Sequence, residues 1–210
     1  MQLHKRDVIE AAAAILDQYG IADLTMRRLA RELGITPGAL YWHFPDKQRL
    51  LGAVADHILR PADVDAGLGA DLDWRSRVRS VCSRMRDALL SHTDGAELVS
   101  ASFAAGQSRG VGHLLTALAG AAAEAGLAPA QSELAARTIL YYVLGATADE
   151  QSRMQWDAAG AVPETQSVIA PSANPSSGFD FGLRLLIDGI AGQPAAGRVS
   201  PDTVGANAPR

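Results

Sequence analysis

The chain has 210 residues, 48% of them hydrophobic and only 5% aromatic, and its formal net charge is −4 at pH 7. This length suits one compact domain or two small ones, and abundant Ala and Leu with few β-branched runs favour all-helical packing. The charge is uneven, because residues 1–60 hold eight Lys and Arg against seven Asp and Glu, while residues 61–210 hold eleven against sixteen. The acidic surplus thus belongs to the C-terminal part and does not exclude nucleic-acid binding by the N-terminal part.

Several classes of protein are disfavoured by the sequence. Residues 2–7 lead straight into an amphipathic helix without a signal peptide, and no apolar run reaches the roughly 18 residues that span a membrane. Cys82 is the only cysteine, so an intrachain disulfide and a CxxC metal site are both excluded. Its apolar neighbours predict a buried thiol, with a redox switch as the less favoured alternative. We expect a cytoplasmic protein.

The N-terminal part is predicted to form four helices. Apolar residues recur at helical spacing, Thr25 and Thr36 have the residue type of N-caps, and Gly34 marks a tight turn between two short helices. The Arg60-Pro61 pair is expected to end the fourth helix, because a residue before proline disfavours helical backbone angles. The expected helices cover residues 5–19, 25–33, 36–44 and 46–59.

The C-terminal part is predicted to contain five longer helices, at residues 73–91, 95–104, 110–125, 129–154 and 178–191. A Gly/Asp-rich link precedes them at residues 61–72, and residues 156–177 have the composition of a mobile loop. We therefore expect an all-α fold with three parts. These are a helix-turn-helix DNA-binding domain with a connector helix (1–60), a larger ligand-binding and dimerisation domain (61–192) and a disordered tail (193–210).

Residues 25–47 carry the strongest functional signal. A glycine between two short helices, followed by a threonine N-cap and exposed aromatic residues, is typical of a DNA-reading helix-turn-helix. A helical hairpin with an aromatic core is the alternative, but one helical face cannot bury the adjacent residues Tyr41, Trp42 and His43 together.

The residues expected to contact DNA have different roles. Arg27 is the best candidate for a bidentate contact to guanine. Pro37 offers an apolar face to a thymine methyl group, and Trp42 is expected to pack against a sugar or a thymine methyl. The other polar side chains, and the backbone amides at the start of the fourth helix, are expected to contact phosphates. The full set is Thr25, Arg27, Thr36, Pro37, Gly38, Ala39, Tyr41, Trp42, His43 and Lys47.

Residues 24–44, with Lys47 and the Leu50-Leu51 pair, closely resemble the N-terminal domain of the tetracycline-repressor (TetR) family. Residues 89–96, 144–151 and 179–189 resemble the C-terminal domain of the branch that contains the tetracycline repressor itself. The resemblance covers most of residues 4–192. It implies a repressor that binds a palindromic operator in double-stranded DNA as a homodimer and is released by a small molecule, with antibiotic or multidrug resistance as a typical regulated trait.

The resemblance also implies roles for individual residues. Arg27 matches the guanine-binding position of the tetracycline repressor, whereas Gly38 and Ala39 replace larger residues, so that operator sequence does not transfer. Val99 stands in place of a histidine that ligates the drug's magnesium, and Tyr141 in place of another histidine. We therefore expect an apolar or aromatic effector, without a metal or cofactor. The implied pocket residues are Met85, Val99, Ser102, Phe103, Leu115, Tyr141 and Asp149.

The last two predicted helices carry apolar residues on more than one stripe and are the expected dimer faces. The expected interface residues are Leu140, Val143, Leu144, Phe181, Leu185 and Ile187. An activator of the same family and a DNA-binding protein without an effector are the nearer alternatives. An enzyme on a helical bundle is the distant one, because the five histidines lie far apart and no catalytic grouping is visible.

Overall fold

The computed structural model describes residues 3–62, 72–161, 163 and 176–194, and over these residues it contains helices and no strand. The all-α prediction is confirmed, and each expected helix is present. The helices are α1 (Lys5–Tyr19), α2 (Met26–Glu32), α3 (Pro37–His43), α4 (Lys47–Leu59), α5 (Trp74–Leu90), α6 (Gly95–Ala104), α7 (Arg109–Glu124), α8 (Pro129–Ala158) and α9 (Ser176–Ala191), with short 3₁₀ turns η1 (Ile21–Asp23) and η2 (Arg60–Ala62). The expected tail lies outside the described residues apart from its first two.

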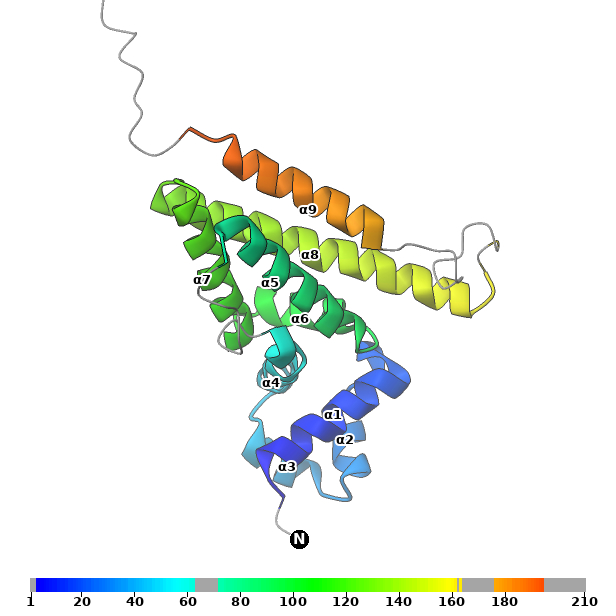
Figure 1. The fold of residues 1–210 in the computed structure, drawn as a ribbon. Coiled ribbons are helices and arrows are strands. Elements are labelled where there is room, and N and C mark those ends of the chain that lie inside the picture. The colour runs from blue at the N-terminus through cyan, green and yellow to red at the C-terminus, as the bar shows by residue number, and fades with distance from the viewer. Residues whose placement is uncertain (1–2, 63–71, 162, 164–175, 195–210) are drawn as a thin grey trace, which may run out of the picture.

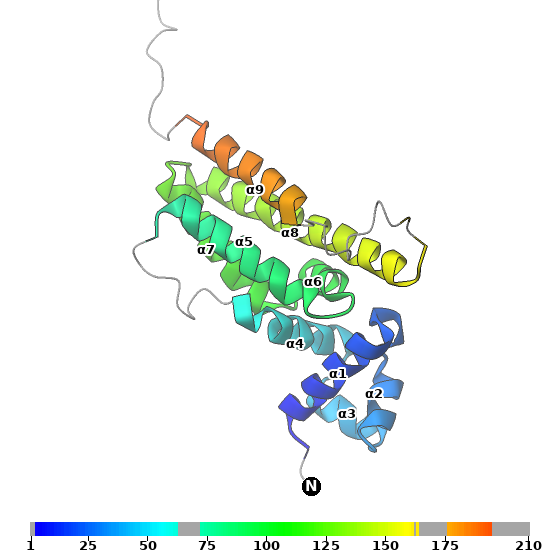
Figure 2. The ribbon, with the colours of Figure 1, turned by 45° about the vertical axis from the view of Figure 1, so that its right-hand side comes forward.

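The helices form an elongated molecule with two distinct ends. Figure 1 shows α1, α2 and α3 gathered at one end, and α8 and α9 side by side at the other. Helix α4 leads from the first group to α5, α6 and α7, an arrangement that Figure 2 shows from a second direction. In the described part of the chain, no helix has the length and apolar character needed to cross a membrane.

The N-caps of the short helices are those predicted from the sequence. The Thr25 hydroxyl oxygen accepts the amide of Arg28 at 3.2 Å, and the Thr36 hydroxyl oxygen accepts the amide of Ala39 at 3.3 Å. Gly34 has a φ of +64°, in the region that favours glycine. These local interactions therefore determine where α2 and α3 begin and how the chain turns between them.

Helix α8 is longer than predicted and runs to Ala158 instead of residue 154. The Gln155 side-chain amide in this extension donates to the Asp94 carboxylate at 2.8 Å, a contact across 61 residues of sequence. The extension thus has a tertiary partner that helical periodicity cannot reveal. Most of the expected mobile loop, residues 164–175, lies outside the described residues.

Burial of Cys82 is confirmed. The side chain is 1% exposed, and its sulfur belongs to the core between α5 and its neighbours. Desolvation raises the pKa of the thiol to about 12, so that the thiolate needed for oxidation or metal binding is suppressed at neutral pH.

Helix α4 packs tightly between the N-terminal helices and α6 and α7. Leu50, Val54 and Ile58 on its inner face are at most 1% exposed. On the same helix, a Cβ at Gly52 would overlap the backbone carbonyl of Gln107 in the α6–α7 turn. Glycine is therefore required there for close approach.

We expect Gly52→Ala to lower the free energy of unfolding by about 1–3 kcal/mol, because the added methyl group must push α4 away from the backbone at Gln107. Urea unfolding at fixed protein concentration measures this change. Gly120→Ala is the matched control, since a Cβ at this α7 position meets nothing within 4 Å. It should stabilise the protein by about 0.5–1 kcal/mol through helix propensity. Equal effects of both substitutions would contradict this view of Gly52.

Candidate nucleic-acid interface

The helices α2 and α3 form a helix-turn-helix whose inner faces are fully packed. Leu29, Ala30 and Leu40 are at most 1% exposed. The turn is closed by the amide of Ile35, which donates to the carbonyl of Ala30 at 3.0 Å, and by that of Gly34, which donates to the carbonyl of Arg31 at 3.1 Å. A compact scaffold of this kind holds the outer face of α3 in a fixed orientation.

The outer face of α3 is both apolar and accessible. Trp42 is 90% exposed and Tyr41 48% exposed, while His43 is half-buried. The first turn of the helix is exposed as well, at Pro37, Gly38 and Ala39. This face lies at the end of the molecule opposite α8 and α9 (Figure 2). An extended partner could therefore reach it without meeting the larger group of helices.

Adjacent arginines on α2 have different surroundings. Arg28 donates to the carboxylate of Asp23, and its guanidinium carbon lies 3.6 Å from the centre of the Tyr19 ring. Arg27 is exposed, and no hydrogen bond or ion pair holds it among the described residues. Arg28 therefore serves the fold, whereas Arg27 is available to a ligand.

The start of α4 is only partly available to a phosphate. Lys47 is its first residue and is half-buried. The Asp46 carboxylate accepts the amide of Arg49 at 2.7 Å, so one of the amides expected to face a phosphate is already occupied. Lys47 therefore lies next to the negative charge of Asp46, which competes with a phosphate at this helix start.

A polar junction, which the sequence analysis did not identify, connects α1 to the turn between α5 and α6. The Asp17 carboxylate lies 3.0 Å from Nδ1 of His92 and accepts the amide of Thr93 at 3.2 Å. The Asp94 carboxylate accepts the amide of Ile21 at 3.0 Å on one oxygen and the Gln155 amide on the other. The N-terminal helices are thus tied to α8 through a single aspartate.

The α5–α6 turn is itself fixed by Gln151 of α8, which is 9% exposed. Its amide nitrogen donates to the carbonyls of Leu89 at 3.0 Å and His92 at 2.7 Å, and its oxygen accepts the amide of Ala96 at 3.1 Å. One side chain therefore satisfies three buried backbone groups at the end of α5 and the start of α6.

A neutral histidine lies close to this junction. The His57 ring centre is 6.4 Å from that of His92, and Arg60 donates to Nδ1 of His57 at 3.2 Å. Burial, followed by the positive charge of Arg60, lowers the pKa of His57 below its usual 6.5. His57 therefore acts as an uncharged acceptor for Arg60.

The structure brings only some of the expected effector residues together. Met85, Val99 and Ser102 are buried in the core, and the Ser102 hydroxyl donates to the Leu98 carbonyl. Phe103 and Tyr141 have ring centres 6.1 Å apart at the edge of α6 and α8. Half-buried Leu115 packs against the core.

Asp149 lies apart from these residues, because its side chain is 64% exposed and paired with Arg153 one turn later. Three cavities in the described chain have volumes of about 330, 320 and 300 Å³, and none of these three is lined by the expected effector residues. Of the residues implied by the resemblance, Met85, Val99 and Ser102 are thus packed in the core, Phe103 and Leu115 are half-buried, and Tyr141 and Asp149 are exposed.

The expected dimer face needs correction. Four of its residues are at most 6% exposed and belong to the core of the single chain, so they offer little surface to a second copy: Leu140, Val143, Leu144 and Ile187. The sequence of a helix with two apolar stripes does not reveal which stripe is buried within its own chain and which is exposed. Phe181 and Leu185, by contrast, are 56% and 57% exposed.

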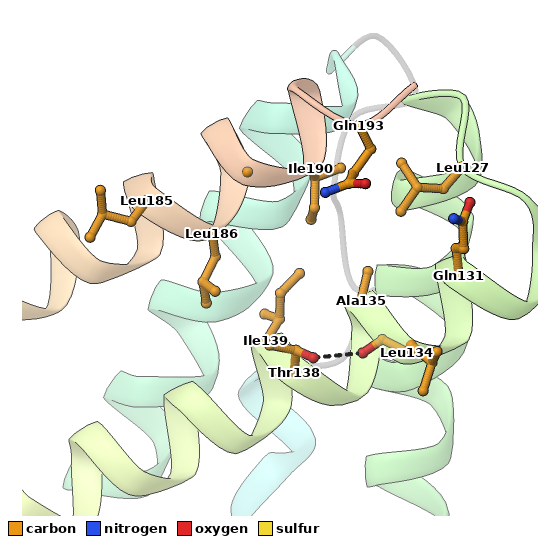
Figure 3. A pocket seen from close by; sticks show the side chains of 11 residues that line it. Leu127, Gln131, Leu134, Ala135, Thr138, Ile139, Leu185, Leu186, Ile190 and Gln193 are labelled. Carbon is orange, nitrogen blue, oxygen red and sulfur yellow. Dashed lines mark hydrogen bonds between the residues drawn. The ribbon is translucent and has the colours of Figure 1, made fainter. Parts of the chain in front are cut away.

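An outer apolar face remains on α8 and α9. Leu134 and Tyr141 of α8 are 65% and 56% exposed, alongside Phe181 and Leu185 of α9. Between these helices lies the cavity of about 330 Å³, which Figure 3 shows with Leu134, Leu185, Leu186 and Ile190 around it. Isolated apolar residues are common on surfaces, but a continuous apolar groove indicates an interface or a ligand.

Comparison with known proteins identifies relatives over both parts of the chain. The family described as "Bacterial regulatory proteins, tetR family" matches residues 8–54, and "Tetracyclin repressor-like, C-terminal domain" matches residues 68–193. The class A tetracycline repressor protein from transposon 1721 of Escherichia coli is 33% identical over 202 residues, 90% of this chain and 91% of that protein.

Solved structures of other proteins also match this chain over about nine-tenths of its length. The crystal structure of Mycobacterium smegmatis BioQ has a TM-score of 0.82 and 59% identity, over 90% of this chain and 98% of that chain. The crystal structure of BioQ with its natural double-stranded DNA operator has a TM-score of 0.78 and 56% identity, over 91% of this chain and 100% of that one.

Proposed function

Because the chain belongs to the TetR family of bacterial regulatory proteins, we propose that it is a transcriptional repressor which binds a palindromic operator as a homodimer. The observation that carries this proposal is the exposed outer face of α3 on a tightly packed helix-turn-helix. Similarity to BioQ, which has been crystallised with its DNA operator, supports it. Its role is regulatory instead of enzymatic, and it works in the cytoplasm, where its operator lies.

The two parts of the chain have different functions. Residues 1–60 bind DNA, with Arg27 reading a base and with Pro37 and Trp42 contacting sugars or thymine methyl groups. The polar contacts to phosphates come from Thr25, Thr36, Tyr41, His43 and Lys47, with Gly38 and Ala39 allowing close approach. Residues 61–192 bind the effector and the second copy.

Dimerisation uses the outer apolar face of α8 and α9. Two copies pairing there must bring their α3 helices to the same side of the assembly, because a palindrome requires these helices about 34–36 Å apart, one turn of DNA. Phe181 and Leu185 stay in the proposed interface, and Leu134 and Tyr141 replace the four buried residues. Pairing of the same face on both copies gives a closed two-fold dimer.

Release requires an effector that binds one conformation better than another. We place the effector among Met85, Val99, Ser102, Phe103 and Leu115, where core packing must open to admit it, with exposed Tyr141 at the edge that this site shares with the dimer face. A shift there reaches α3 through α4 and through the junction at Asp94. The operator-binding conformation is then disfavoured, because the two α3 helices no longer match the half-site spacing.

We expect Arg27→Ala to weaken operator binding by about 1–3 kcal/mol per half-site and to relax discrimination at one base pair, because a bidentate base contact is lost. Lys47→Ala should weaken operator and random DNA alike and reduce the salt slope by about one per subunit. Fluorescence anisotropy over a salt series measures both. If each variant lost equal affinity on operator and random DNA, Arg27 would not read a base.

We expect Leu185→Asp to raise the dimer dissociation constant at least about a hundredfold, since it places an unpaired charge in the apolar interface. Sedimentation velocity at several concentrations measures the shift. Ala123→Asp, which puts the same charge on the exposed side of α7, is the control and should stay dimeric. A Leu185→Asp protein that dimerises like the parent would rule out this face.

We expect magnesium-tetracycline to release the protein from its operator poorly. Val99 offers only methyl groups where a metal needs a nitrogen or oxygen ligand, and an unpaired polar edge in an apolar wall costs about 1–3 kcal/mol. Titration of the operator complex, with the class A tetracycline repressor on its own operator as positive control, measures release. Release of both proteins at similar micromolar drug concentrations would disprove the expectation.

A further inference from the structure

A cavity of about 320 Å³ lies between the C-terminal end of α4 and the first turn of α7. Arg60 borders it from the end of α4, and Arg109 and His113 border it from α7. Leu59 and Leu114, both nearly fully buried, form its apolar wall. The cavity therefore combines cationic side chains from two helices with an apolar surface, a composition typical of small-molecule sites.

The acidic side chain of this cavity is already engaged. Asp56 Oδ1 accepts the hydroxyl of Ser108 at 2.7 Å and the amide of Gly110 at 2.8 Å. The carboxylate thus caps the start of α7 and links it to α4. It does not form an ion pair with either arginine of the cavity among the described residues.

The two arginines, both exposed, consequently bring uncompensated positive charge to the rim of this cavity. Arg60 is held by His57 Nδ1, an uncharged acceptor. Arg109 has neither a hydrogen bond nor an ion pair in the part of the chain that the structure describes, and the same is true of His113. Arg60, Arg109 and Asp56 sum to a net charge of +1.

We propose that this cavity binds a small organic oxyanion, namely a carboxylate or phosphate monoester on a short apolar body. Guanidinium groups present paired donors that match the oxygen atoms of these anions, and the leucine wall suits the apolar body. None of the core residues that we assign to the effector lines this cavity. It is a second ligand site on the same chain.

The position of the site gives the ligand a regulatory consequence, and this part rests on the proposed function. An anion that contacts Arg60 and Arg109 together joins the end of α4 to the start of α7. The bound anion thereby favours the orientation of α4 in which both arginines contact it. Because α4 also packs on the N-terminal helices, the affinity for the operator changes when the anion binds.

Isothermal titration of the full-length protein without DNA tests the site, with hexanoate, hexyl phosphate and hexanamide as probes. We expect one anion per chain for at least one of the two anions, and binding of neutral hexanamide at least about tenfold weaker. Arg109→Gln should weaken anion binding at least about tenfold. Arg153→Gln, which removes an exposed arginine from α8, is the matched control and should bind like the parent.

Absence of saturable binding of both anions would overturn the proposal. So would equal binding of hexanamide, or unchanged anion affinity in a folded Arg109→Gln protein, as checked by circular dichroism. Operator affinity with and without the bound anion tests the regulatory part, and an unchanged value overturns that part. Failure of the anion-free protein to bind any operator would instead count against the proposed function, because anion binding is measured without DNA.

Discussion

The contact of α4 with the α6–α7 turn is the constraint on which the rest of the structure depends. Helix α4 packs on α1 with one side and on α6 and α7 with the other, so it determines how the helix-turn-helix sits relative to the larger group of helices. Gly52 permits this approach, and the Asp56 carboxylate fixes it by capping α7. Helix α4 therefore connects α7 to α1 by direct packing.

A second connection, beside α4, joins the N-terminal helices to the larger group of helices. It consists of hydrogen bonds from Asp17 and Asp94 across the junction, whereas α4 is held mainly by apolar packing. Hydrogen bonds of this kind contribute roughly 0.5–1.5 kcal/mol each and can be exchanged for water at a partly exposed site. The junction can thus break and reform while α4 stays packed, which suits a regulator with two conformations of similar free energy.

Local features of the fold were predictable from the sequence, and tertiary ones were not. Thr25, Thr36 and Gly34 act on their immediate neighbours, so the helix-turn-helix and its exposed face follow from residue type and spacing. The end of α8 was missed because Gln155 finds its partner 61 residues away. The buried Leu140 was placed in the dimer face because periodicity shows that a stripe is apolar, but not which molecule covers it.

The exposure of Trp42 has a thermodynamic consequence for DNA binding. Counterion release on DNA binding scales with the number of phosphates that lysine and arginine side chains contact, and the first sixty residues hold eight such side chains against seven acidic ones. In the proposed complex, burial of the Trp42 indole ring against DNA adds a driving force that ionic strength hardly weakens. The binding free energy would then have an apolar part, marked by a negative heat-capacity change, beside the salt-dependent part from phosphate contacts.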